Sequence, residues 1–423
     1  MATIRQIKAR EILDARGFPT VEVLVELSDG SIATASNPSG TSKSTYEAFE
    51  LRDNDPKRHM GMGVLQAVDM ITRTLAPQFI GIEATNQKLL DQTLIGIDGT
   101  HTKAKLGANT TMPLSMAFAK AGAKSQSTPL FLYLRNFLAK ENVPLRIPTP
   151  AMNMVNGGRH AGNNINFQEF LVIPATSQSY SNSLMMGVTV YNSLRGQLKK
   201  GSLTTTVGDE GGFAPNFENN VDAFDFISQA VSSAAFRLGY DIFIGLDAAA
   251  KNFFQDQEYK IKDKESPMNS NELITFYEEI VKKYHLIYLE DPLSEEDWQG
   301  WSTLSTRLTS KALLVGDDLT ATNPFRLQQA LNSKSINGLV IKPGQIGTVL
   351  ESLAVVEMGR HAGLKLIVSH RNGETNDDFI ADYSVAIGAD YAKFGAPARG
   401  ECVAKYNRLL EIEQLLLNSS QAV

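Results

Sequence analysis

Six short apolar runs between residues 241 and 396 each end in a charged or polar side chain. Most of these ends lie about 25 residues apart, the spacing expected for strand–helix units. The runs are Phe243–Leu246, Leu286–Leu289, Leu313–Val315, Leu339–Ile341, Leu366–Val368 and Tyr391–Ala392. Strands buried on both faces are apolar throughout, so a charge at the carboxyl end marks where each strand leaves the core. We therefore predict a closed parallel (β/α)8 barrel, an α/β fold, whose strand ends meet at one mouth, where barrel enzymes keep their catalytic groups.

Three of these strand ends carry carboxylates, Asp247, Glu290 and Asp317. Crowded carboxylates repel one another unless a cation neutralises them, and oxygen ligands without Cys or His select Mg²⁺ or Mn²⁺ over Zn²⁺. The alternative is that each carboxylate caps a helix or pairs with a surface lysine, as is common for a single Asp or Glu. Because three occur at successive strand ends, we predict that they hold a divalent metal ion.

Two other strand ends carry lysines, Lys342 and Lys393. A lysine amine with its ordinary pKa of about 10.4 is a poor base at neutral pH. Burial, a second ammonium and a divalent cation each disfavour the charged form, so Lys342 in this setting is a candidate base. A salt bridge from Lys342 to one of the metal-site carboxylates is the alternative interpretation.

Candidate acids and anion-binding groups lie on the remaining loops. Glu169 lies in the strand-like stretch 167–173 and Glu210 follows a β-branched run, in apolar and glycine-rich settings that can keep one carboxyl protonated as a general acid. His160 and His370 are candidate hydrogen-bonding groups, ligands or acids, although an isolated histidine is more often structural. Arg371 offers a planar fork suited to carboxylate or phosphate. A lysine base, a carboxylic acid and a divalent metal together suit proton abstraction next to a metal-bound carboxylate, followed by loss of a β-hydroxyl.

The first 139 residues have a different pattern. Val21, Val23 and Val25 alternate with Glu22, Leu24 and Glu26, as in a half-buried strand, and the turn residues 28–30 lead to a third strand at 31–35. Helical patterns follow at 46–52, 63–75, 86–94, 109–125 and 130–138. Three prolines then mark residues 140–150 as a linker. We predict a smaller N-terminal α+β capping domain at 1–139 and a barrel catalytic domain at 140–423, with helices at 220–238, 271–284 and 348–361.

Composition excludes several classes of function. A net charge of −6 gives no general attraction to nucleic acid or to anionic membranes. The single cysteine, Cys402, rules out an internal disulfide and suits a reducing compartment. No apolar run approaches the roughly 20 residues that span a bilayer, and residues 1–20 lack the apolar segment of a signal peptide. We therefore expect a cytoplasmic protein with neither nucleic-acid nor membrane partners.

Long motifs distributed along the chain match one family in the family's own order. They include AREILDARGFPT (9–20), DGTHTKAKLGAN (98–109), NMVNGGRHAGNN (153–164), VGDEGGFAPN (207–216), LEDPLSEEDWQGW (289–301), VGDDLTATNP (315–324), IKPGQIGT (341–348) and SHRNGET (369–375). On these residues the chain resembles the enolase family over nearly its whole length. The resemblance implies an N-terminal α+β domain packed on an eight-stranded barrel whose first strands and helices depart from strict βα order.

The resemblance also implies an activity. It would be that of a hydro-lyase (phosphopyruvate hydratase), the Mg²⁺-dependent reversible dehydration of 2-phospho-D-glycerate to phosphoenolpyruvate in glycolysis and gluconeogenesis. Lys342 would remove the C2 proton and Glu210 would protonate the departing C3 hydroxyl, with Glu169, His160 and His370 nearby. Enolases are usually homodimers and sometimes octamers.

Substrate and metal contacts follow from the same resemblance. Asp247, Glu290 and Asp317 would hold one Mg²⁺. A second Mg²⁺ would arrive with the substrate, bridged by its phosphate and Ser39. The other substrate contacts would be Gln168, Lys393, Arg371 and Asn372.

Departures from the family pattern lie mostly at the phosphate end. Residues 38–44 read PSGTSKS, with Lys43 and Ser44 where the family has Thr and Gly, and Asn372 replaces a serine. Two alternatives therefore stay open: an enolase paralogue that dehydrates a related 2-O-substituted, phosphono-type glycerate, and a catalytically retired binding or structural protein. Retention of both Lys342 and Glu210 speaks against the retired protein.

Overall fold

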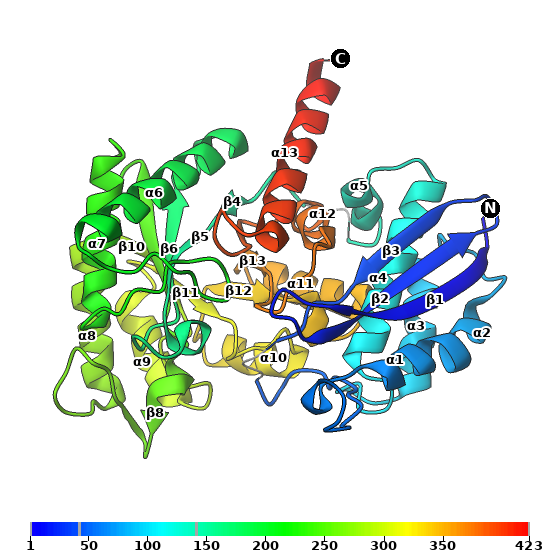
Figure 1. The fold of residues 1–423 in the computed structure, drawn as a ribbon, viewed down its shortest axis with the longest axis horizontal. Helices are drawn as coiled ribbons and strands as arrows, with labels where there is room; N and C mark the ends of the chain where they lie inside the picture. The colour runs from blue at the N-terminus through cyan, green and yellow to red at the C-terminus, as the bar shows by residue number, and fades with distance from the viewer. Residues whose placement is uncertain (1, 41–43, 140–142, 422–423) are drawn as a thin grey trace.

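The computed structural model describes residues 2–40, 44–139 and 143–421. A small α+β part formed by the first third of the chain lies beside a large barrel formed by the rest, on the right and left of Figure 1 respectively. The long last helix, α13, extends away from both at the top of the view. Among the described residues, none of the helices combines the length and apolarity needed to span a membrane.

The N-terminal part begins with an antiparallel three-stranded sheet in the order β1-β2-β3. Its strands are β1 (Ile4–Leu13), β2 (Pro19–Leu27) and β3 (Ile32–Ser36). Val21, Val23 and Val25 are fully buried, and they face α4, which packs on β2 and β3. The alternation predicted from the sequence is thus confirmed, because one face of β2 has to cover the helical layer.

Helices make up the rest of this part. They are α1 (Leu65–Asp69), a π-helix (Met70–Leu75), α2 (Ala76–Phe79), α3 (Gln87–Asp98), α4 (Ala108–Ser125) and α5 (Leu130–Arg135), with a 3-10 turn at His59–Gly61. The helix predicted at 46–52 is wrong. The backbone there forms a turn and an irregular segment, in which Asn109 bonds both the N–H and the C=O of Leu51, at 2.8 and 2.9 Å, and Phe49 bonds Thr102 and Ala108.

The barrel is one nine-stranded sheet in the order β4-β14-β13-β12-β11-β10-β7-β6-β5. Its strands are β4 (Thr149–Pro150), β5 (Met152–Asn156), β6 (Glu169–Pro174), β7 (Ile242–Asp247), β10 (Leu286–Glu290), β11 (Leu313–Gly316), β12 (Gly338–Ile341), β13 (Lys365–Ser369) and β14 (Tyr391–Lys393). The edge strands β4 and β5 are consecutive in the chain, and the N–H groups of Ala151 and Asn153 bond Ala392 and Gly395. These bonds bring the two edges together and make the barrel nearly closed.

The expectation of an all-parallel barrel is wrong at one place. β6 runs antiparallel to both β5 and β7, whereas the strands from β7 through β14 to β4 are parallel. The chain makes a hairpin-like β5–β6 pair and then two helices in succession, α6 and α7, before β7. The predicted departure from strict βα order is therefore confirmed, and it reverses one strand.

The helices around the barrel are α6 (Tyr180–Lys200), α7 (Asn220–Ser233), α8 (Ser270–Tyr284), α9 (Trp298–Leu308), α10 (Pro324–Asn332), α11 (Val349–His361), α12 (Phe379–Ala386) and α13 (Gly400–Gln421). Short pieces complete the fold: the hairpin β8 (Phe254–Gln255) and β9 (Glu258–Tyr259), and 3-10 turns at Gly158–Ala161, Ala250–Phe253 and Pro343–Gln345. Helices α7 and α8 begin at capping boxes, in which Asn219 and Asn269 accept bonds from the first turn. Helix α7 ends at Ser233, five residues before the end predicted from its apolar pattern.

Buried polar contacts join the two parts. Lys103 of the N-terminal part bonds Glu351 of α11 at 2.7 Å, and Lys120 of α4 bonds Asp377 at 2.7 Å. Asp91 of α3 accepts a bond from the N–H of Leu350 in the first turn of α11. These contacts lie across the boundary predicted at residues 139 and 140, which itself stays a prediction.

Candidate active site

The carboxyl ends of the barrel strands place the predicted residues at one mouth. Glu290 on β10 pairs in register with Asp247 on β7, and Ser369 on β13 pairs with Lys393 on β14. Because adjacent strands end at the same level, the side chains that follow them converge. The cavity at this mouth is lined by ten of the thirteen predicted residues: His160, Gln168, Glu169, Glu210, Asp247, Asp317, Lys342, His370, Arg371 and Asn372.

Glu290 and Lys393 lie just beneath this cavity and connect its walls. Lys393 is buried, and its Nζ lies 2.7 Å from Glu290 Oε1, 3.2 Å from Asp247 Oδ2 and 3.4 Å from Glu169 Oε2. Burial lowers the pKa of Lys393, but these carboxylates outweigh it and raise the pKa well above its usual value. One ammonium thus lies among three buried carboxylates.

The donor set at this mouth fits a divalent cation. Burial raises the pKa of Asp247 to about 7 and, together with the charge of Asp247, raises that of Glu290 to about 8. The buried Oδ1 of Asp317 has no hydrogen-bond partner among the described residues. The set of Asp247, Glu290 and Asp317 contains carboxylates and no sulfur or imidazole ligand. Carboxylate oxygens are the ligands that Mg²⁺ prefers.

Lys342 follows β12 and forms an ion pair with Asp317. Burial lowers the pKa of the Lys342 amine, but the carboxylates of Asp317, Glu290 and Asp318 together outweigh it, so the pKa is raised. Burial raises the pKa of Asp317, but the positive charges of Lys342 and Lys393 lower it below its usual value. The contact is the salt bridge that the sequence left open as the alternative to a free base.

Two carboxyls and two histidines form a second cluster. His160 Nδ1 and His370 Nε2 each lie 3.3 Å from an oxygen of Glu210, and His160 is 3.9 Å from Glu169. Burial raises the pKa of Glu210, but the two histidines outweigh it and bring the pKa well below its usual value. Burial and the charge of Glu210 raise the pKa of Glu169 to about 8. The two environments thus move the pKa values of the two carboxyls apart, with Glu169 the more readily protonated of the two.

The protonation of His160 and a bond from Asn153 complete the surroundings of Glu210. Burial lowers the pKa of His160, but Glu210, together with Glu169 and Asp247, outweighs burial and raises it to about 9. Asn153 on β5 donates a hydrogen bond to Glu210 at 3.0 Å. Glu210 is therefore held as an anion by two histidines and an amide.

The predicted phosphate contacts lie on the loops that meet above β13. Arg371 is buried and paired with Glu47, and Asn372 accepts a 3.4 Å bond from Arg16. Arg16 also bonds the hydroxyl of Ser39, which donates to Asp14.

Ser39 therefore does not line the cavity, although its backbone pairs with Gly373 beside Asn372. Ser44 bonds Glu295 and the carbonyl of Asp318. Lys43 lies outside the described residues.

Sequence reasoning missed a third group of side chains. The carboxylate oxygens of Asp291, Asp317 and Asp318 lie within 4.8 Å of one another, and Lys251 lies 2.8 Å from Asp318. Asp291 has a positive φ of 40°, which turns its carboxylate back to accept bonds from the N–H groups of Asp317 and Asp318. The signal was the doublets Glu290-Asp291 and Asp317-Asp318, of which the prediction used only the first member.

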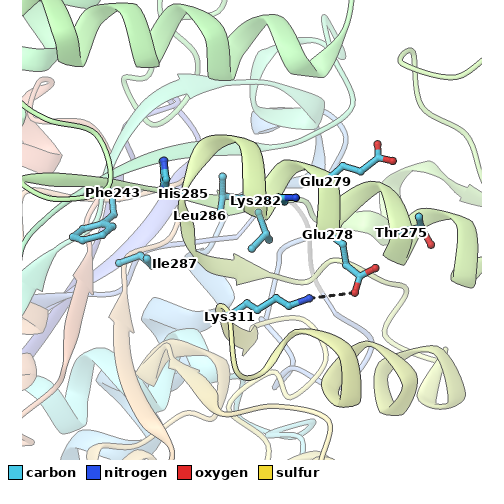
Figure 2. Close-up of a pocket in the computed structure, with 10 residues that line it drawn as sticks. Phe243, Thr275, Glu278, Glu279, Lys282, His285, Leu286, Ile287 and Lys311 are labelled. Atoms are coloured by element: carbon cyan, nitrogen blue, oxygen red, sulfur yellow. Dashed lines mark ion pairs between the residues drawn. The ribbon is translucent and has the colours of Figure 1, made fainter.

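A second, larger cavity lies at the opposite end of the barrel strands (Figure 2). It has a volume of about 580 Å³, an apolar floor of Phe243, Leu286 and Ile287, and a rim that includes the ion pair between Lys311 and Glu278. It contains none of the predicted site residues. Since barrel enzymes keep their chemistry at the carboxyl ends of the strands, the smaller polar cavity is the candidate active site.

Comparisons with known proteins show which proteins this chain is similar to. Residues 4–134 match the model of "Enolase, N-terminal domain", and residues 144–422 match that of "Enolase, C-terminal TIM barrel domain". A curated protein named "Enolase", from Acidothermus cellulolyticus (strain ATCC 43068 / DSM 8971 / 11B), is 48% identical over 416 residues, which cover 98% of this chain and 95% of the relative.

Proposed function

The chain belongs to the enolase family, and from this premise we propose how its residues carry out the dehydration of 2-phospho-D-glycerate to phosphoenolpyruvate. The activity is that of a hydro-lyase, phosphopyruvate hydratase. Sequence identity to the curated enolase along nearly the whole chain favours this activity over the two alternatives, the phosphono-substrate paralogue and the catalytically retired protein. The observation that carries the residue roles is the meeting of Lys342, the carboxyl pair Glu169 and Glu210, and three metal-type carboxylates at one barrel mouth.

Asp247, Glu290 and Asp317 would hold one Mg²⁺, and a second would accompany the substrate phosphate near Ser39. When bound, the first ion would neutralise the carboxylates that now retain the proton on Lys342, and would stabilise negative charge on the substrate carboxylate. The support is the all-oxygen donor set and Oδ1 of Asp317, which has no hydrogen-bond partner in the described part of the chain. The presence and the number of ions are both measurable by titration of metal-free protein.

Lys342 accepts the C2 proton as a neutral amine. Its partner Asp317 is one of the proposed metal ligands, so the ion pair that raises its pKa is the contact that metal binding weakens. Lys393 stays charged among Glu169, Asp247 and Glu290 and supplies a fixed positive charge for the substrate carboxylate. A base after β12 and a fixed cation on β14 thus divide the work that one lysine cannot do alone.

Glu210 delivers the proton that leaves with the C3 hydroxyl. In the protein alone that proton lies on the neighbouring Glu169, whose pKa is raised to about 8 by burial and by the charge of Glu210. Oxygens of both carboxyls and a ring nitrogen of His160 lie within 4.8 Å, so one proton can be shared between them. Glu169, His160 and His370 set the protonation of Glu210, while Gln168, Arg371 and Asn372 hold the remaining substrate groups.

The activity is tested by the ultraviolet absorbance of phosphoenolpyruvate formed by the Mg²⁺-loaded protein. The roles are tested by exchange of the C2 proton with solvent. Lys342→Ala should abolish this exchange, and persisting exchange would refute its role as the base. Glu210→Gln should block dehydration while leaving exchange measurable, and loss of both would show that Glu210 is not acting only as the acid.

Assembly and location complete the proposal. We expect a cytoplasmic homodimer or octamer, as the family resemblance implies, acting on a phosphorylated small molecule. Sedimentation velocity of the purified full chain measures the assembly directly.

A further inference from the structure

Tyr288 lies on β10 two residues before Glu290, so the two side chains point to the same face of the strand, the interior of the barrel. The hydroxyl of Tyr288 donates a hydrogen bond to Oε2 of Glu290. The other oxygen, Oε1, accepts a 2.7 Å bond from Lys393. Both oxygens of Glu290 thus accept hydrogen bonds. The Lys393 ammonium, which bonds Oε1, also contacts Asp247 and Glu169, whereas the neutral Tyr288 phenol bonds Oε2 of Glu290.

The ring of Tyr288 is fixed by the packing of the barrel interior. It is fully buried in a cluster with, among others, Leu171, Val315 and Ile367. Its partner in register on β7 is Gly245, where an added Cβ would lie 3.2 Å from the Tyr288 Cβ. The absence of a side chain at 245 leaves room for the large residue at 288. The position of the hydroxyl is therefore set by the core.

We propose that Tyr288 is a positioning residue for the metal ligand Glu290. The inference rests on the proposed metal site. A buried carboxylate with a single orientation loses little conformational freedom when it binds a cation, and groups that orient metal ligands typically change metal affinity by about 10–100-fold when they are removed. Without the phenol, Oε2 would lack its partner in a dry interior, and Glu290 would turn toward Lys393, which competes with the cation.

Tyr288→Phe removes the hydroxyl and keeps the ring. Tyr391→Phe is the matched control, because the Tyr391 ring packs edge-on against Tyr288 with centroids 6.4 Å apart and forms no bond with Asp247, Glu290 or Asp317 among the described residues. We expect the Kd for Mg²⁺, measured by calorimetry on metal-free protein, to rise at least tenfold in Tyr288→Phe and to stay within twofold of wild type in Tyr391→Phe. Mn²⁺ binding followed by electron paramagnetic resonance should rank the affinities of the three proteins in the same order.

A purely structural role predicts a different result. Tyr288→Phe would then lower the free energy of unfolding in EDTA and leave the Kd for Mg²⁺ unchanged, which would overturn the proposal. A change of equal size in Tyr391→Phe would overturn it as well.

A measurement on proteins that retain Tyr288 does not depend on how well the variant folds. Mg²⁺ should produce a near-ultraviolet tyrosine difference spectrum in wild type and in Tyr391→Phe, and its absence from both would contradict the proposal. Failure of the metal site itself is distinguishable, since wild-type protein would then bind no Mg²⁺ at all.

Discussion

Lys405 on α13 anchors the loop that carries His370, Arg371 and Asn372. Its ammonium is fully buried and donates to Glu374 Oε2 at 2.8 Å, to the carbonyl of Thr375 at 2.8 Å and to that of Glu401 at 2.9 Å. Glu374 is also buried, and its carboxylate accepts bonds from the N–H groups of Arg371 and Thr375. A single ammonium on the last helix therefore neutralises the acid that shapes this part of the site.

Lys405→Met keeps the length of the side chain and leaves Glu374 as a buried anion without a countercharge. Removing one partner of a buried pair costs about 3–5 kcal/mol. The two N–H donors to Glu374 remain, so we expect the lower half of that range, about 3–4 kcal/mol. The free energy of urea unfolding in EDTA measures it, and KM for 2-phosphoglycerate should rise because Arg371 and Asn372 lose their support.

Two controls make the test sharp. Lys365→Met breaks a pair with Asp390 in which the lysine side chain is 57% exposed, so it should cost less than about 1 kcal/mol. Adding Glu374→Gln to Lys405→Met removes the uncompensated charge and should recover most of the loss. If Lys405→Met costs no more than Lys365→Met, the desolvation argument is refuted.

Two further predictions concern pH and metal. Burial lowers the pKa of His160 and Glu210 raises it to about 9, above the ordinary value of 6.5, so its charge stabilises the fold fully below pH 6.5 and less as pH rises through 9. Wild type should lose up to about 3 kcal/mol of unfolding free energy by pH 10 from this group, and His160→Gln should lose that pH dependence. Mg²⁺ at 100 times its Kd should add about 2.7 kcal/mol to the free energy of unfolding, and Asp317→Asn should gain much less at the same concentration.

Most of the fold could be predicted because its strands are simple to recognise. A strand buried on both faces has to be apolar until it leaves the barrel, so β7, β10, β11, β12, β13 and β14 end at or next to the residues that the pattern indicated. Strand direction carries no such signal, which is why the antiparallel β6 was not predicted. The missed segment at 46–52 has a helical pattern, but its backbone groups bond the distant Asn109 and Thr102.

The residues missed at the site depend on contacts between strands. Asp291 directs its carboxylate through a positive φ and through two N–H groups at the end of β11, and no local pattern encodes either. Tyr288 is part of an apolar run and reads as core, which it is, and only the structure shows that its hydroxyl reaches Glu290. A hydrophobic pattern identifies an apolar strand as buried, but it does not show that one side chain in that strand has a polar partner.

The protonation of Lys342 shows most clearly where sequence reasoning stops. The sequence places Lys342 near another lysine and near carboxylates, and these two kinds of neighbour act in opposite directions on its pKa. The structure decides between them: the ion pair with Asp317, together with the charges of Glu290 and Asp318, outweighs burial and Lys393, so the pKa of the amine is raised and it holds its proton. A cation that shares Asp317 would weaken that attraction while burial and Lys393 remain, and the balance would then favour the neutral amine. We therefore expect proton abstraction by Lys342 to depend on the metal, and the test is the Lys342-dependent exchange of the C2 proton, which should require the divalent ion.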